Sequence, residues 1–240
     1  MTDTIVLVHG AFHGGWCWDR ILPGLAEAGL TALAIDLPGH GVGDSGPVGD
    51  LAGDAAHLRG VLDELSGPVV LVGHSYGGAV ISEAAAGRSD VAHLVYLAAV
   101  VPDAGEGIGG ASAEIDPGAA SMTITDAFVP SADGSTVRVA DHAIREIFYH
   151  DCSDADVAFA RERLSDQSTA SFAQTLTGAA WRAIDSTYVL CTDDRTVPVP
   201  VQRANAARTG TTVELATSHS PFFSAPADLV GVLVSVAQRT

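Results

Sequence analysis

The stretch at residues 69–78 constrains the fold of this chain more than any other. It reads VVLVGHSYGG, in which a strand-like apolar run is followed by Gly-x-Ser-x-Gly and then by a helix-like segment. In this pattern the serine occupies a sharp turn, and a Cβ at Gly73 or Gly77 would crowd that turn. The turn presents the Ser75 hydroxyl above a sheet edge and at a helix N-terminus, whose dipole favours developing negative charge. The stretch therefore predicts a strand–turn–helix unit with Ser75 at its apex.

Apolar runs alternate with helix-like stretches along much of the chain, which is the pattern of βαβ units. The near-continuous apolar character of these runs suits strands that are covered on both faces. We expect strands at residues 5–8, 32–35, 69–72, 93–98, 188–191 and 213–216. We expect helices at residues 18–28, 51–65, 76–87, 200–207 and 225–237. The sequence thus predicts an α/β fold with a mostly parallel central sheet flanked by helices.

Residues 103–185 break this alternation. Their first part is rich in Gly, Ala and Ser and indicates a loop, whereas residues 142–148 and 154–164 look helical. A long insertion between two strands of a compact sheet is more often a lid or a binding element than a plain connection. We therefore predict one α/β core from residues 1–102 and 186–240, with residues 103–185 as a cap.

The charge of the chain limits its partners. The formal net charge is −17, and all 12 basic residues are arginines. A surface this acidic repels phosphate backbones and anionic lipid headgroups, so we expect neither a nucleic-acid nor a membrane partner. Without lysine, no internal Schiff base can form. The sequence leaves a homodimer open.

The cysteines and the N-terminus carry little signal. The three cysteines are widely spread and include no CxxC pair, which indicates neither a disulfide framework nor a zinc site. The spacing of His9 and His13 would suit a metal pair on a helix, but it falls in a glycine-rich loop, so we expect no metal. No apolar run approaches the ~18–20 residues that span a bilayer, and no leader pattern opens the chain. We expect a cytoplasmic protein.

The glycine-rich segment VHGAFHGGW at residues 8–16 follows the first predicted strand. Such a loop can aim a backbone N–H at the carbonyl oxygen of an ester. Ala11 is the predicted donor, and Tyr76, which follows Ser75, supplies the other N–H. Sites of α/β sheets form where strands end, so we expect this loop to face Ser75.

An acid and a histidine follow the last two predicted strands. The segment VLCTDDRTVP at residues 189–198 offers two adjacent carboxylates. Asp194 fits the role of orienting a histidine better, by its place just before the Arg-x-Val-Pro turn, whereas Asp193 suits a capping or solvent-exposed role. His219 lies in the loop after the last strand. The chain order Ser, Asp, His predicts Ser75 as nucleophile, Asp194 as orienting acid and His219 as general base.

These segments resemble those of the α/β-hydrolases, and more narrowly the group that contains plant methylesterases, hydroxynitrile lyases and bacterial carboxylesterases. The likeness rests on HGAFHGGWCW at residues 9–18, GHSYGG at 73–78, CTDDRTVP at 191–198 and TSHSPFF at 217–223. It covers nearly the whole chain, weakly in the insertion. The resemblance implies a triad at the same three residues, oxyanion donors at Ala11 and Tyr76, and an insertion that caps the active site.

The expected reaction is hydrolysis of a small to mid-sized carboxylic ester or lactone through an acyl-enzyme, with no cofactor. Two alternatives use the same triad: carbon–carbon cleavage of the hydroxynitrile-lyase type, and acyl transfer or cyclisation. In the family, such lyases carry a lysine after the catalytic histidine and a threonine in the oxyanion loop. This chain has Ser220 and Ala11 there. Both departures favour hydrolysis.

Aromatic and histidine side chains near the predicted site or in the insertion are candidate pocket walls. They are Phe12, His13, Phe128, Phe148, Tyr149 and Trp181. Packing between cap and core would account for them equally well.

Overall fold

The computed structural model describes residues 4–44, 46–108 and 127–240. Its centre is a six-stranded parallel sheet with the strand order β2-β1-β3-β4-β8-β9. The strands are β1 (Thr4–Val8), β2 (Thr31–Ile35), β3 (Val69–His74), β4 (Val91–Leu97), β8 (Ser186–Cys191) and β9 (Thr211–Leu215). Every residue of β3 is buried, which is why its sequence is continuously apolar until the turn. All the predicted strands are present, and the predicted fold class is confirmed.

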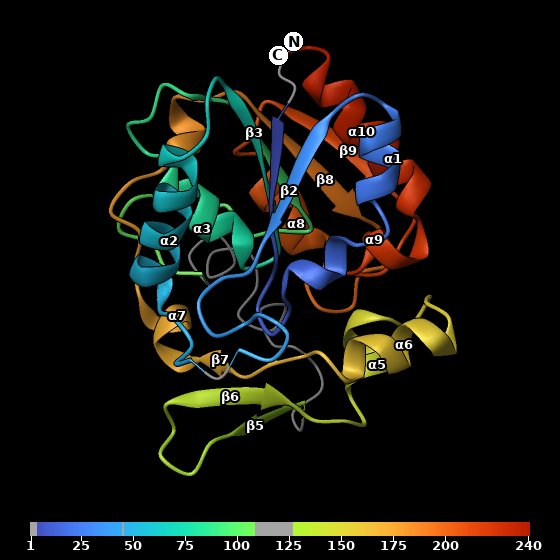
Figure 1. The fold of residues 1–240 in the computed structure, drawn as a ribbon. Coiled ribbons are helices and arrows are strands. Elements are labelled where there is room, and N and C mark those ends of the chain that lie inside the picture. The colour runs from blue at the N-terminus through green and yellow to red at the C-terminus, as the bar shows by residue number, and fades with distance from the viewer. Residues whose placement is uncertain (1–3, 45, 109–126) are drawn as a thin grey trace.

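Helices cover both faces of this sheet (Figure 1). On one face α1 (Leu22–Glu27) packs with α10 (Pro226–Ala237), and on the other α2 (Leu51–Asp63) packs with α3 (Gly77–Ala84). The shorter helices α8 (Val199–Ala206) and α9 (Pro221–Ser224) follow β8 and β9. None of the helices in the described ranges is long and apolar enough to span a bilayer.

The first predicted helix, residues 18–28, begins later than expected. Gly15–Trp18 forms a separate 3-10 turn, η1, and α1 starts only at Leu22, with a proline in its first turn. Asp50 caps α2, since its side chain accepts from the Gly53 N–H at 2.8 Å.

The chain between β4 and β8 adds a layer at the carboxyl ends of the parallel strands (Figure 1). It holds a small antiparallel sheet of β5 (Phe128–Pro130), β6 (Thr136–Val139) and β7 (Gln167–Ser168). Its helices are α5 (Ile144–Phe148), α6 (Asp154–Arg161) and α7 (Thr169–Ala173), followed by the 3-10 turn η2 (Ala180–Arg182). The helices predicted at residues 142–148 and 154–164 are thus present as α5 and α6. Much of the predicted loop at the start of the insertion lies outside the described residues.

The topology alone gathers the predicted site. Ser75 follows β3, and the glycine-rich loop follows β1, its direct neighbour in the sheet. Asp194 and His219 follow the neighbouring pair β8 and β9. Because all these strands are parallel, the four segments emerge at the same edge of the sheet.

Candidate active site

Ser75 lies in the turn between β3 and α3 with a φ of 52°, in the left-handed region that non-glycine residues rarely adopt. The end of β4 holds this turn in place. The Ser75 N–H donates to the Leu97 carbonyl at 3.0 Å, and the Ser75 carbonyl accepts from the Val100 N–H at 3.2 Å. Backbone strain of this kind clusters at functional sites.

Glycines make the close approach around this turn possible. A Cβ on Gly73 would lie 2.5 Å from the Gly77 carbonyl oxygen, and a Cβ on Gly77 would lie 2.7 Å from the His9 carbonyl oxygen. In the loop after β1, a Cβ on Gly10 would lie 2.9 Å from the Ser75 Cβ. The loop therefore approaches the serine as closely as a backbone can.

His219 and Asp194 form a buried hydrogen-bonded pair. Nδ1 of His219 lies 2.7 Å from Oδ2 of Asp194, and the two side chains are 1% and 0% exposed. A carboxylate only accepts, so Nδ1 carries the proton and Nε2 keeps its lone pair. The backbone of His219 is also held, because Nε2 of His74 donates to its carbonyl at 2.9 Å. The pair has the tautomer that a general base requires.

The Asp194 carboxylate is fixed on both oxygens. Oδ1 accepts from the N–H groups of Thr196 at 2.7 Å and Val197 at 3.0 Å. Oδ2 accepts from Nε2 of Gln202 at 3.1 Å in addition to His219. These donors compensate the desolvation of a buried carboxylate.

Asp193, the neighbouring acid, is exposed. Its backbone carbonyl accepts from Nε2 of His150 at 2.8 Å, and its N–H donates to the Thr217 carbonyl at 3.0 Å. The structure therefore joins His219 to Asp194 and leaves the side chain of Asp193 at the surface.

The two predicted oxyanion donors, Ala11 and Tyr76, line the same cavity as Ser75. Within the described part of the chain, neither of their N–H groups is used in a hydrogen bond. By contrast, the next N–H in the loop, that of Phe12, donates to Oε1 of Gln167 at 3.2 Å.

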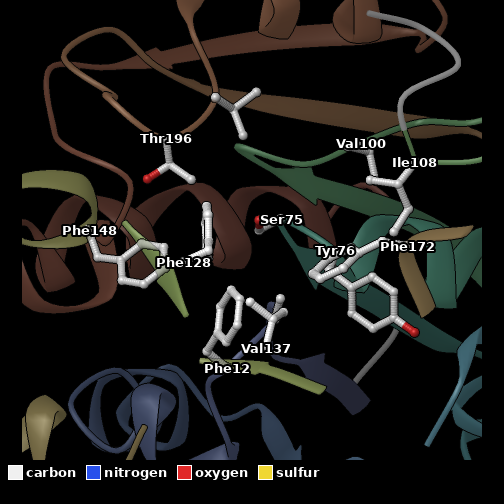
Figure 2. A pocket seen from close by; sticks show the side chains of 12 residues that line it. Phe12, Ser75, Tyr76, Val100, Ile108, Phe128, Val137, Phe148, Phe172 and Thr196 are labelled. Carbon is white, nitrogen blue, oxygen red and sulfur yellow. The ribbon is translucent and has the colours of Figure 1, made fainter. Parts of the chain in front are cut away.

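A cavity of about 370 Å³ opens at Ser75. Figure 2 shows aromatic rings on both sides of the serine, with Phe128 and Phe148 on one side and Tyr76 and Phe172 on the other. The walls of the cavity are aromatic (Phe12, Tyr76, Phe128, Phe148, Phe172) and aliphatic (Val100, Ile108, Val137, Val197). Among the described residues that line it, none carries a charge.

Two other polar groups in this lining are engaged elsewhere. The Tyr76 hydroxyl donates to Oδ2 of Asp54 at 2.6 Å, and the Thr196 hydroxyl donates to the Ile147 carbonyl at 2.5 Å. The cavity is therefore apolar around Ser75.

The structure corrects half of the predicted pocket walls. Phe12, Phe128 and Phe148 line the cavity, but His13, Tyr149 and Trp181 do not. Nδ1 of His13 donates to the Ala11 carbonyl at 2.8 Å, and its Nε2 accepts from the Tyr149 hydroxyl at 2.6 Å. The Trp181 ring lies beneath the guanidinium groups of Arg182 and Arg208, and its N–H donates to the Pro102 carbonyl. All three support loops instead of facing the cavity.

Sequence reasoning also missed several lining residues. Thr196 and Val197 lie two and three residues after the predicted acid, and Val100 lies shortly after the end of β4, so position after a strand end could have indicated them. Ile108, Val137 and Phe172 are isolated apolar residues of the insertion, which carry no such signal.

Four further buried histidines surround the site. They are His9, His13, His40 and His74. Burial is the main cause that lowers the pKa of each, to about 3 for His13 and about 4 for His40. Across the described residues, no group of His, Cys, Asp and Glu side chains is arranged to hold a metal ion. These histidines are uncharged structural groups at neutral pH.

Comparisons with known proteins agree with this fold. A family model described as "Alpha/beta hydrolase family" matches residues 5–232. A pyrethroid hydrolase of Sphingobium wenxiniae is 31% identical, over 99% of this chain and 88% of its own length. Methylesterase 7 of Arabidopsis thaliana is 28% identical, over 98% of this chain and 96% of its own. The crystal structure of a pyrethroid hydrolase from Sphingobium faniae superposes with a TM-score of 0.83 at 28% identity, covering 99% of this chain and 98% of that one.

Proposed function

The chain belongs to the alpha/beta hydrolase family, and on that premise we propose that it is an esterase that works through Ser75, His219 and Asp194. The observation that carries this proposal is the buried His219–Asp194 pair, at 2.7 Å, on the sheet edge that also bears the Ser75 turn. The cavity at Ser75 gives an ester access to the nucleophile.

In this mechanism, Nε2 of His219 takes the proton of the Ser75 hydroxyl as Oγ attacks the acyl carbon. Asp194 holds the Nδ1 proton and stabilises the imidazolium. The N–H groups of Ala11 and Tyr76 bind the oxyanion of the tetrahedral intermediate. Its collapse releases the alcohol, which takes its proton from His219. Water then attacks the acyl-enzyme with His219 again as base, and the acid is freed.

The cavity favours an uncharged ester with an apolar, ring-containing part. Its described walls are aromatic and aliphatic, and a charged substituent would lose hydration there without gaining a partner. A volume of about 370 Å³ lies within the usual range of small-molecule pockets. The names of the relatives, pyrethroid hydrolase and methylesterase, lead us to include pyrethroids and methyl esters among the candidate substrates.

We extend the proposal to the insertion, residues 103–185, as the cap of the site. Five cavity walls come from it: Ile108, Phe128, Val137, Phe148 and Phe172. The insertion therefore contributes to substrate selection as well as to coverage.

Ser75→Ala tests the proposal with a panel of p-nitrophenyl esters of graded chain length. We expect a loss on the order of 10⁶ in kcat, because the nucleophile is removed. Ser235→Ala, at an exposed serine of α10, is the matched control and should keep full activity. If Ser75→Ala keeps more than about a tenth of the activity, an effect under ~1.4 kcal/mol, Ser75 is not the nucleophile.

A further inference from the structure

The side chain of Gln167, in β7 of the insertion, is fully buried and bonded to the loop after β1. Its Oε1 accepts from the Phe12 N–H at 3.2 Å, and its Nε2 donates to Oγ of Ser171 at 2.9 Å. Ser171 gives its own proton to the Ser168 carbonyl at 2.6 Å, so towards Gln167 it can only accept. This arrangement fixes which end of the amide faces Phe12.

Phe12 is held in a conformation that an isolated phenylalanine avoids. Its φ is 68°, in the left-handed region, and such strain persists only where the surroundings impose it. The Phe12 carbonyl accepts from the Ser165 N–H at 2.9 Å. Both backbone groups of Phe12 are thus bonded to residues 165–167 of the insertion, which therefore impose this conformation.

These bonds also determine the backbone of Ala11. The peptide plane that joins Ala11 to Phe12 is held at both ends, since its N–H bonds Gln167 and its carbonyl accepts from Nδ1 of His13 at 2.8 Å. The plane before it is held through the Gly10 carbonyl, which accepts from the His13 N–H at 3.3 Å. With both planes fixed, the direction of the Ala11 N–H is fixed as well.

We propose that Gln167 is a positioning residue for the oxyanion site, which acts through Phe12 to hold the Ala11 N–H towards the carbonyl oxygen of the substrate. This inference rests on the proposed function, in which Ala11 is an oxyanion donor. An oxyanion donor acts mainly in the transition state, so displacing the Ala11 N–H lowers kcat. KM stays nearly unchanged, because it depends on apolar contacts between the substrate and the cavity.

Gln167→Met tests the inference, because it replaces the amide with an apolar group of similar size. Gln174→Met is the matched control. Gln174 also ties the insertion to the core, accepting from the Ala52 N–H at 3.2 Å and donating to Asp50 at 2.8 Å, but it does so at α2. We expect a ~10–100-fold loss of kcat for Gln167→Met with KM within about twofold, since small misplacements of catalytic groups cost up to ~10². Gln174→Met should stay within about twofold in both constants.

A pair of ketone inhibitors separates positioning from loss of folded enzyme. An aryl trifluoromethyl ketone accepts the Ser75 oxygen at its carbonyl carbon, the serine proton passes to His219, and the adduct carries an oxyanion. The corresponding methyl ketone binds without forming this adduct. Gln167→Met should raise the inhibition constant of the trifluoromethyl ketone by about the factor lost in kcat and leave that of the methyl ketone unchanged. Inhibition constants do not depend on the fraction of folded enzyme, so this result would not arise from a loss of folded protein.

Ser171→Ala provides a milder variant, which frees the Gln167 amide without removing it. It should show a smaller loss in the same direction, and it decides the question if Gln167→Met does not fold. Equal losses in the Gln167 and Gln174 variants, or a rise in KM at constant kcat, would overturn the inference. An active Ser75→Ala enzyme in the same assay would instead overturn the proposed function, so the two failures are distinguishable.

Discussion

Asp193 and Asp194 are chemically identical neighbours, and their surroundings separate them. Asp194 is buried against His219 and accepts from two N–H groups, whereas Asp193 is exposed. We predict that Asp194→Asn lowers kcat on the order of 10⁴-fold, because an amide can donate to Nδ1 and so favours the wrong tautomer. Asp193→Asn should change kcat less than about threefold in the same p-nitrophenyl ester assay. Similar losses of kcat in both variants would show that Asp194 is not the residue that orients His219.

The residues next to the base and the acid also bear on the choice between hydrolase and lyase. Ser220 follows His219, and Arg195 pairs with Glu146 of the insertion. Cleavage of a cyanohydrin develops negative charge on cyanide, which a cation near the base would stabilise. The described lining offers none.

We therefore predict that the protein turns over acyl esters but releases no cyanide from mandelonitrile above the uncatalysed rate. A cyanide assay and an ester assay on one preparation provide the measurement. Cyanide release with negligible esterase activity would leave only the fold and the His219–Asp194 pair standing.

At the scale of elements, we expect replacement by alanine to have opposite effects at two glycines, a loss of activity at Gly10 and a gain of stability at Gly60. Gly10→Ala would place a Cβ 2.8 Å from Nδ1 of His74 and 2.9 Å from the Ser75 Cβ, so we expect the loop after β1 to shift and activity to fall at least ~10²-fold. Gly60 lies at an exposed position of helix α2, with nothing within 4 Å of an added Cβ. Gly60→Ala should raise the free energy of unfolding by ~0.5–1 kcal/mol at unchanged activity. Urea denaturation and ester kinetics on both variants test this, and an active Gly10→Ala enzyme would contradict it.

The core elements could be predicted because each carries its own periodic or turn signal. The run before Ser75 predicts β3, and the glycines around it predict the turn. The strands β5, β6 and β7 are only two to four residues long, so they carry no pattern that a sequence reading can detect.

Side-chain direction in the site was harder to predict than its composition. His13 and Phe12 are adjacent, yet Phe12 lines the cavity while His13 lies beneath the loop, because Phe12 takes a left-handed φ of 68°. The role of Gln167 depends on a contact between residues 155 positions apart, which no local spacing reveals. Long-range contacts of this kind appear only in the folded chain.

At the scale of the whole molecule, the buried histidines dominate the expected response to acid. Each has a pKa lowered below its value of about 6.5 in the unfolded chain, mainly by desolvation. Below that pH these histidines bind protons in the unfolded state but not in the folded state. The free energy of unfolding therefore falls as the pH falls from about 6.5 towards 4. Asp54 opposes this, because burial raises its pKa to about 6 and its contribution is lost as the pH rises from about 4 to 6. We expect the four buried histidines to outweigh this opposing contribution of Asp54.

We predict that the melting temperature is flat from pH 8 to 7 and drops steeply between pH 6 and 5, with each buried histidine contributing up to ~1.4 kcal/mol per pH unit. His40→Gln should make this drop shallower, whereas His57→Gln, at an exposed position of α2, should not. Thermal melts across this range provide the test. An unchanged melting temperature down to pH 5 would exclude the four histidines as the cause of acid sensitivity.

The resemblance carried by four short motifs is confirmed over the whole chain, since the relatives include a bacterial hydrolase and a plant methylesterase aligned across at least 98% of it. The motifs were sufficient because they occupy the strand ends, where the family's chemistry is concentrated. The insertion supplies much of the cavity wall.

The uncharged lining of the cavity has a consequence for product release. In the proposed mechanism, the carboxylic acid forms last at Ser75, and above a pH of about 5 that acid ionises. No described wall offers a cation to hold the anion, and the chain as a whole carries a net charge of −17. The carboxylate product therefore gains hydration when it leaves the cavity and rebinds weakly. Accumulating acid should therefore compete only weakly with fresh ester for the cavity.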